Sequence, residues 1–242
     1  MRIPRLILLL LAIGWSTAPC GVIPAAEPDP DDYLKDSGAG LPGEYAKNYL
    51  VRKSSVSRDE KFALIYPTRE FSEAKEAKNF LVGLNPFRVL ATLPTDEPYF
   101  DGKSNSALGA EWSGDGRMVL IALDGKWGPL DVWLIELADD KVKRMTNLLE
   151  KTRDLLRPGF RAAKPKPELY NKVHEFIFEE EEGGACMFEE NRLIRVYSKV
   201  TNDPKSVSKR PWRFLVDAKW DIAQAKFVSQ KIRPVKPGEN FD

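Results

Sequence analysis

Carboxylates are the side chains with the clearest capacity for chemistry in this 242-residue sequence, which contains 36 aspartates and glutamates. Two carboxylates flanking a sugar linkage can hydrolyse it, one as general acid and the other as nucleophile or general base. Glu111 and Asp131 lie in predicted strands, which could hold such a pair in place. A secreted, glycosidase-like hydrolase is therefore one hypothesis for function, although the sequence alone does not fix the distance between the two groups.

The single histidine, His174, limits other kinds of catalytic and metal site. It precedes the run Glu179–Glu182, but a metal site would need a second histidine or carboxylates spaced on fixed elements. A Ser-His-Asp triad would have to use this same histidine, and the Gly-x-Ser-x-Gly nucleophile motif does not occur. The glycines at 38 and 40 lack the flanking strand and helix of a phosphate-binding loop. We therefore predict no catalytic, metal or cofactor-binding residues, and enzymatic activity is left open but disfavoured.

Two cysteines, Cys20 and Cys186, define the thiol chemistry. Cys186 lies in the apolar stretch Gly183–Phe188, and a nucleophilic role would need an activating base in a chain that has one histidine. We interpret Cys186 as a small buried hydrophobic residue. Because Cys20 is expected to leave with an export signal, no intramolecular disulfide is predicted.

The N-terminus has the pattern of an export signal. Two arginines precede the apolar run Leu6–Trp15, and a small-residue segment containing proline follows. The run has about ten residues, well short of the roughly 20 that span a bilayer. We predict that residues 1–26 are removed by cleavage after Ala26 or Ala25. The mature protein would then be secreted or periplasmic and have no transmembrane anchor.

Lipidation at Cys20 is the alternative fate for this segment, because a cysteine after the apolar run can carry a lipid. The residues before it are Thr17, Ala18 and Pro19. A bacterial lipid-attachment motif has a branched apolar residue at the first of these positions and a small residue at the last. The threonine and the proline therefore disfavour lipidation.

The charge balance gives little indication of a polyanionic ligand. Without the signal, the chain would carry 35 basic and 36 acidic side chains, because only two arginines and no acids are lost with it. A near-neutral chain with scattered charges has no electrostatic footprint for nucleic acid. We expect a monomer without cofactors, whose partner is a protein or an envelope component.

Composition divides the mature chain into three parts. Residues 27–48 are polar and rich in proline and glycine, which indicates a flexible linker. Residues 49–236 contain short apolar runs separated by turn residues, typical of a single β-rich domain, and residues 237–242 form a tail. The predicted strands include Phe62–Tyr66, Phe87–Leu93, Met118–Leu123 and Val132–Leu137, with a C-terminal group over 173–232 comprising Val173–Phe178, Leu193–Val200, Trp212–Val216 and Lys226–Ile232.

The strongest local pattern is the pair Asp115-Gly116 between two apolar segments. Such a pair favours a tight hairpin, because the turn needs a positive φ that glycine supplies and aspartate tolerates. A second turn at Asp124–Pro129 leads into two further strands, Asp131–Leu137 and Lys141–Asn147. Together these segments predict a four-stranded meander.

Parts of this meander resemble one blade of the TolB-type, WD40-like β-propellers. The segments that carry the resemblance are Trp112–Arg117, Val132–Leu137 and Lys141–Asn147. A fainter copy, Ser57–Tyr66, begins 56 residues before its counterpart and has Glu60 where the glycine should be. Blade-like hairpins would thus cover residues 49–147, and a third copy near Glu189–Arg192 is too degraded to count.

The expected fold is mainly β, with antiparallel β-meanders resembling an incomplete propeller or a curved sheet. Propellers need at least four blades to close, more than this length supplies at the observed spacing. One or two short accessory helices are also predicted. The first covers about 147–157, with Thr146 as N-cap and Pro158-Gly159 as its stop, and the second covers residues 68–79.

Tryptophans give the one positive indication of binding. Trp127 stands in the second turn, where an exposed ring would suit recognition of a partner or a sugar, although packing is the favoured interpretation. Trp112 and Trp133 lie in strand patterns typical of core residues, whereas Trp212 and Trp220 are undecided.

The resemblance to TolB-type blades implies a non-enzymatic module that binds a protein or an envelope component through sheet edges and loops. This exported binding module is the main functional hypothesis. The hydrolase that uses a carboxylate pair is the alternative.

Overall fold

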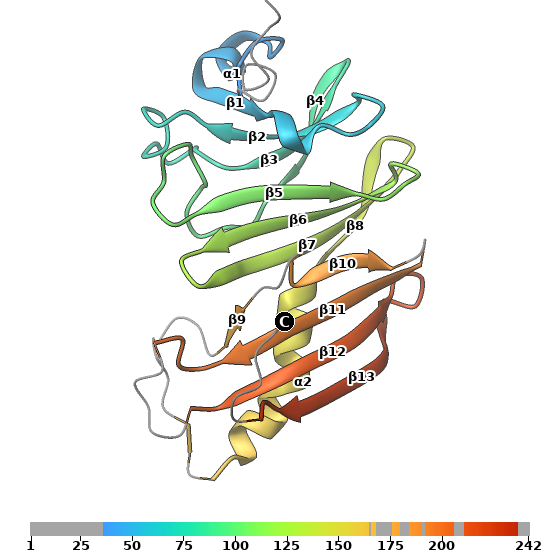
Figure 1. Cartoon of the computed structure of the whole chain (residues 1–242). Coiled ribbons are helices and arrows are strands. Elements are labelled where there is room, and N and C mark those ends of the chain that lie inside the picture. Colours follow the sequence, from blue (N-terminus) through green and yellow to red (C-terminus); the bar gives the residue numbers. More distant parts are fainter. Residues whose placement is uncertain are drawn as a thin grey trace, which may run out of the picture. The chain divides into compact units, whose positions relative to one another are not determined.

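The fold is known from a computed structural model of the whole chain (Figure 1). The structure describes residues 36–164, 166–167, 176–179, 184–189, 192–205 and 211–236. The predicted signal at 1–26, His174 and the predicted tail at 237–242 lie outside these residues.

Strands dominate the described residues and form three antiparallel sheets, each with its main strands in chain order (Figure 1). The first sheet contains β1 (Tyr49–Arg52), β2 (Phe62–Pro67), β3 (Phe80–Leu84) and β4 (Phe87–Thr92). The second contains β5 (Ala107–Trp112), β6 (Met118–Gly125), β7 (Gly128–Ala138) and β8 (Lys141–Asn147). The third contains β10 (Cys186–Glu189), β11 (Leu193–Thr201), β12 (Arg213–Asp221) and β13 (Lys226–Pro234), with β9 (Ile177–Glu179) paired to β11. The prediction of a mainly β fold built from antiparallel meanders is confirmed.

The predicted hairpin at Asp115-Gly116 joins β5 to β6 and is built around a serine. The hydroxyl of Ser113 donates to the carboxylate of Asp115 over 2.7 Å and accepts from the backbone N–H of Met118 over 2.9 Å. Gly116 has φ +68°, which is the left-handed conformation that glycine adopts without steric cost. The side chains of Ser113 and Asp115 therefore supply hydrogen bonds that fix this turn.

The upstream segment Ser57–Tyr66 folds into the same turn, between β1 and β2. The hydroxyl of Ser57 donates to Asp59 over 2.8 Å and accepts from the backbone N–H of Phe62 over 3.0 Å. Glu60 occupies the glycine position and adopts φ +57°. The two turns thus share the same serine-centred hydrogen bonds, and Glu60 bears the strain that a glycine would avoid.

The second sheet contributes to both of the large hydrophobic cores. Trp133 and Ile135 of β7 pack in one core with residues of the first sheet, including Leu64. Val132 and Leu134 pack in the other core with residues of the third sheet. This alternation follows from the two-residue period of a strand, which turns successive side chains to opposite faces.

The predicted helix at 147–157 is present as α2 (Leu148–Ala162), but both predicted ends were wrong. Asn147 is the N-cap, and its side chain accepts from the backbone N–H of Glu150 over 3.0 Å. Pro158 lies inside the helix. The helix continues past it because Phe160 is buried and its ring meets Trp212 at 5.2 Å, and this packing offsets a proline cost of about 3 kcal/mol.

The predicted second helix at 68–79 was wrong. This stretch is a series of turns in which some backbone N–H groups donate to the carbonyl three residues back, as from Phe71 to Thr68 and from Ala77 to Ala74. Phe71 contacts the ring of Tyr49 and Ala77 is buried. Positions six residues apart fall on different sides of a helix, so one face of a single helix could not bury both side chains.

The predicted flexible linker at 27–48 is part of the fold from Asp36 onward. The carboxylate of Asp36 accepts from the guanidinium of Arg52 over 3.0 Å and from the hydroxyl of Tyr66 over 2.6 Å. Leu41 is buried, and helix α1 (Gly43–Asn48) follows it. These contacts join the segment to the first sheet.

Each sheet has a β-bulge in the hairpin formed by its third and fourth strands. The extra residue lies on the fourth strand every time: Leu90 on β4, Lys143 on β8 and Val228 on β13. Bulges increase the local twist and interrupt regular pairing. The same irregularity therefore recurs in the corresponding hairpin of all three sheets.

Candidate binding groove at the fourth-strand edge

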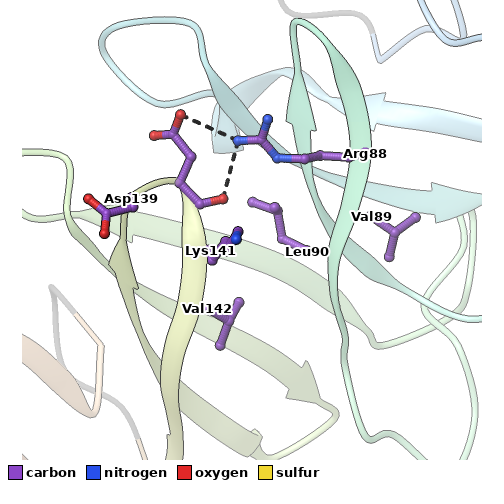
Figure 2. A pocket seen from close by; sticks show the side chains of 7 residues that line it. Arg88, Val89, Leu90, Asp139, Lys141 and Val142 are labelled. Carbon is purple, nitrogen blue, oxygen red and sulfur yellow. Dashed lines mark hydrogen bonds and ion pairs between the residues drawn. The ribbon is translucent and has the colours of Figure 1, made fainter.

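The fourth strand of each sheet is an edge strand, and we call β4, β8 and β13 together the fourth-strand edge. Within the described chain, each of these strands is hydrogen-bonded to a neighbour on one side only. A groove of about 450 Å³ lies between β4 and the β7–β8 hairpin (Figure 2). Its lining residues are Arg88, Val89, Leu90, Asp139, Asp140, Lys141 and Val142.

The floor of the groove is apolar and its rim is charged. Leu90 from β4 and Val142 from β8 lie between the two strands (Figure 2), and both pack against the core shared by the first and second sheets. Arg88, Asp140 and Lys141 surround them. The arrangement suits an apolar side chain that is flanked by charged or polar groups.

Arg88 crosses the groove and connects the two sheets. Its guanidinium donates to the backbone carbonyl of Asp140 over 3.2 Å and lies 3.4 Å from the carboxylate of the same residue (Figure 2). Both side chains are more than one third exposed, so solvent screens the ion pair. The contact therefore positions the hairpin more than it stabilises the fold.

The β7–β8 turn places two aspartates at the groove in a demanding conformation. Asp139 and Asp140 form a two-residue loop with φ of +51° and +55°. Both central residues of a type I′ hairpin turn need positive φ, which usually selects Asn-Gly or Asp-Gly. Two non-glycine residues therefore hold strained backbone at this position.

A second cavity of about 490 Å³ shares Asp139 and Asp140 with the groove. The two serine-centred turns meet there, because Asp59 and Asp115 also line it. Hydrogen bonds from the Arg117 backbone and the Ser113 hydroxyl lower the pKa of Asp115. The Ser57 hydroxyl is the largest cause of the lowered pKa of Asp59. Both carboxylates are thus held ionised by the turns they stabilise.

The second and third sheets are joined by a similar arginine contact. Arg144 of β8 pairs with the buried carboxylate of Glu136 and donates to the backbone carbonyl of Ile222, in the turn between β12 and β13. An arginine on the fourth strand thus reaches a hairpin turn of the following sheet in both junctions. The acidic partners of the two arginines differ in burial: Glu136 is only 9% exposed, whereas the side chain of Asp140 is 55% exposed.

Glu111 and Asp131 do not form the carboxylate pair considered from the sequence. Strand pairing places Glu111 in one cross-strand row with Leu120 and Leu134, and Asp131 in another row with Leu123. The rows are three residues apart, so the two carboxylates lie on opposite faces of the second sheet.

Each of these two carboxylates has its own separate contacts. Desolvation raises the pKa of Glu111, while a hydrogen bond from the Phe188 backbone opposes the rise. Asp131 accepts from the side chain of Asn147 over 2.6 Å and lies 3.9 Å from Arg153, beside the start of α2. Its observed contacts are those of a residue that supports the helix start.

The tryptophans mostly pack. Trp133 is buried, and Trp112 stacks on Phe62 and donates to a backbone carbonyl. Trp212 and Trp220, undecided from sequence, are both core residues. Trp127 is half-buried, with the Lys126 ammonium 5.2 Å from its ring centre. It lies away from the groove residues, beside a hollow of about 40 Å³ that is too small for a sugar.

The described residues contain no group of three or more histidine, cysteine or acidic side chains placed to hold a metal ion. The predicted role of Cys186 as a buried hydrophobic residue is confirmed, since it belongs to the core between the second and third sheets. No described helix is long and apolar enough to cross a membrane.

Sequence reasoning did not single out Arg88, Asp139, Asp140 or Lys141. The available signal was Asp139-Asp140 between two predicted strands, which fits a two-residue hairpin. Nothing local connects this turn to Arg88, which lies 52 residues away. No protein-family model matches the chain, and comparison with curated proteins gives no match either.

Proposed function

We propose that this chain is an exported, non-enzymatic module that binds another protein through the fourth-strand edge. One observation carries the proposal: the large hydrophobic side chains exposed among the described residues are Val89, Met145 and Val228, one on each strand of this edge. Single exposed apolar residues need no explanation, but here each falls on the same strand of successive sheets. Protein interfaces combine such apolar contacts with a polar rim.

The groove between β4 and β8 supports binding rather than catalysis. The described residues that line it include no histidine, cysteine or serine, and the arginine among them is paired with Asp140. The separation of Glu111 and Asp131 onto opposite faces also removes the pair that motivated the hydrolase hypothesis. An apolar floor with a charged rim is the usual chemistry of a protein-recognition site.

Export and a relationship to TolB-type propellers belong to the same proposal. The arginines, apolar run and small residues at the N-terminus support export. Three successive meanders and the shared serine-aspartate turn support the relationship, because propeller blades are four-stranded antiparallel sheets. The protein would then act outside the cytoplasm, where it binds a protein or an envelope component.

The test is cross-linking and pull-down from the native envelope fraction with the tagged protein and a triple variant, Val89→Ser, Met145→Ser and Val228→Ser. The wild-type chain is expected to enrich a defined partner. The variant is expected to capture at least tenfold less of that partner. Each site is exposed, so the stability of the variant should change by only about 0.5 kcal/mol per site.

Ala107→Ser on β5 is the matched control, because Ala107 is exposed on the opposite edge of the second sheet. It should leave capture unchanged. The proposal fails if no partner is enriched by the wild-type chain, or if the triple variant captures as much as the control while remaining folded in a thermal melt.

A further inference from the structure

We infer, on the basis of the proposed function, that the partner contributes an acidic, extended polypeptide segment. The segment lies along the fourth-strand edge, from the β4–β8 groove to the start of β13. Charge distribution, the inter-sheet contacts and the bulges each bear on this inference.

The fourth-strand edge is basic although the chain as a whole is near neutral. Its strands carry no acidic residue. Their basic residues are Arg88 on β4, Lys141, Lys143 and Arg144 on β8, and Lys226, Lys231 and Arg233 on β13. The opposite edge strands β1, β5, β9 and β10 carry Arg52 and the three glutamates Glu111, Glu179 and Glu189. Charge is therefore separated between the two edges, and an anionic partner suits the fourth strands.

The inter-sheet contacts connect each fourth strand to the turn that precedes the next fourth strand, and the proposed line of the segment follows these connections. Arg88 holds the β7–β8 turn, and β8 begins immediately after that turn with Lys141. Arg144 holds Ile222 in the β12–β13 turn, and β13 begins after it with Lys226. Packed sheets lie about 10 Å apart, so a line across three sheets covers about 20 Å. An extended chain of about six residues spans that length at roughly 3.3 Å per residue.

The lysines in this line are available to a partner. Lys141, Lys143, Lys226 and Lys231 are all exposed. Across the parts of the chain that the structure describes, none of the four makes an ion pair. Carboxylates of a bound segment would provide the missing partners.

The bulges bear on whether such a segment is bound through its backbone or through side chains. An extra residue on each fourth strand interrupts the row of backbone groups that an added strand would need, and it also hinders edge-to-edge pairing with a second copy. Recognition therefore depends on side chains. Lysines carry the charge, and the floor formed by Leu90 and Val142 takes an apolar side chain from the same segment.

The experiment measures binding of a fluorescein-labelled octapeptide of glutamates with one central leucine, by fluorescence anisotropy at 20 and 200 mM salt. The full chain without its signal is used. Wild-type protein is expected to bind at low salt and to lose about tenfold or more in affinity at high salt. Lys141→Glu with Lys143→Glu is expected to weaken low-salt binding at least tenfold. Lys75→Glu with Lys151→Glu changes net charge equally at exposed sites away from the edge and should weaken it less than threefold.

A substitution of Asp139 should strengthen binding, because this acid lies at the groove rim and repels an acidic segment. Asp139→Asn keeps a residue that tolerates positive φ and should tighten binding about threefold. Equal weakening by the two lysine pairs would overturn the inference. So would binding of anionic lipid vesicles or single-stranded DNA at least as tight as that of the peptide. The peptide could fail to bind while the wild-type chain still captures a partner that the triple serine variant loses. In that case the inference of an acidic segment is wrong and the proposed function stands.

Discussion

At the scale of single residues, a few side chains hold conformations or environments that cost stability. Glu60, Asp139 and Asp140 adopt a left-handed backbone, and Asp124 has a buried carboxylate oxygen with no hydrogen-bond partner among the residues that the structure describes. Each cost has a physical cause that a single substitution can remove. These residues therefore provide direct tests of the structure.

Glu60→Gly is expected to raise the free energy of unfolding by about 1 kcal/mol, because glycine adopts φ +57° without the steric cost that glutamate bears. The reciprocal change, Gly116→Glu, places glutamate at the equivalent position of the second turn and should lower it by a similar amount. Urea denaturation of both variants measures the two changes in the free energy of unfolding. Changes of the same sign would show that the two turns are not equivalent.

Asp124→Asn is expected to stabilise the protein at pH 7 and to make little difference at pH 3. Desolvation raises the pKa of Asp124, so the folded state binds its proton more tightly than the unfolded state does. The protonated group favours the fold below its ordinary pKa of about 4, and this contribution is lost as pH rises through the raised value. Denaturant midpoints at several pH values give the comparison, and a variant less stable than wild type at pH 7 would contradict it.

At the scale of elements, the two inter-sheet arginines differ in how much each stabilises the fold. Arg144→Ala would leave Glu136 buried without its ion-pair partner and should cost about 2–3 kcal/mol. Arg88→Ala removes a contact between groups that are 38% and 55% exposed and should cost less than about 1 kcal/mol. Thermal or urea denaturation of the two variants tests the difference, and a larger loss for Arg88 would show that burial does not govern these contacts.

Most strands could be predicted because their sequences carry local signals. The Asp115-Gly116 turn and the strand at Lys141–Asn147 were predicted with the observed bounds, since an Asp-Gly pair between apolar segments and alternating polarity are visible in a short window. The extent of α2 could not be predicted, because Phe160 joins it to the ring of Phe176, which is remote in sequence.

The candidate groove could not be predicted for the same reason. It is assembled from two hairpins, and the contact between Arg88 and Asp140 depends on how the first and second sheets pack. The short strands β1, β3 and β10 were also missed. Each has only four or five residues, and it is recognised in the fold through pairing with a neighbour.

At the scale of the whole molecule, the second sheet is central because it packs in both large cores. The outward side of the first sheet is covered by a third cluster that includes Leu41 and Tyr45. In the third sheet, Arg195 pairs with Asp217 and lies over the ring of Tyr197, in positions that alternate with core residues of β11. Side chains thus cover the faces of the first and third sheets that do not pack against the second sheet.

This arrangement predicts the order of hydrogen exchange. Amides of β6 and β7 should exchange most slowly, by global unfolding, whereas those of β13 and β1 should exchange through local openings that cost at least about 2 kcal/mol less. Native-state exchange followed by mass spectrometry measures this order. Slower exchange in β12 than in β7 would contradict the central role of the second sheet.

The two inter-sheet arginines also determine which positions can vary among relatives of this protein. Both donate to main-chain carbonyls, of Asp140 and of Ile222, and every residue type supplies that acceptor. Mutational drift in the turns would leave the acceptor intact, whereas loss of either arginine would remove the donor. Selection should therefore retain the two arginines and tolerate change in the turns that they hold, a pattern that an alignment of homologous sequences would reveal.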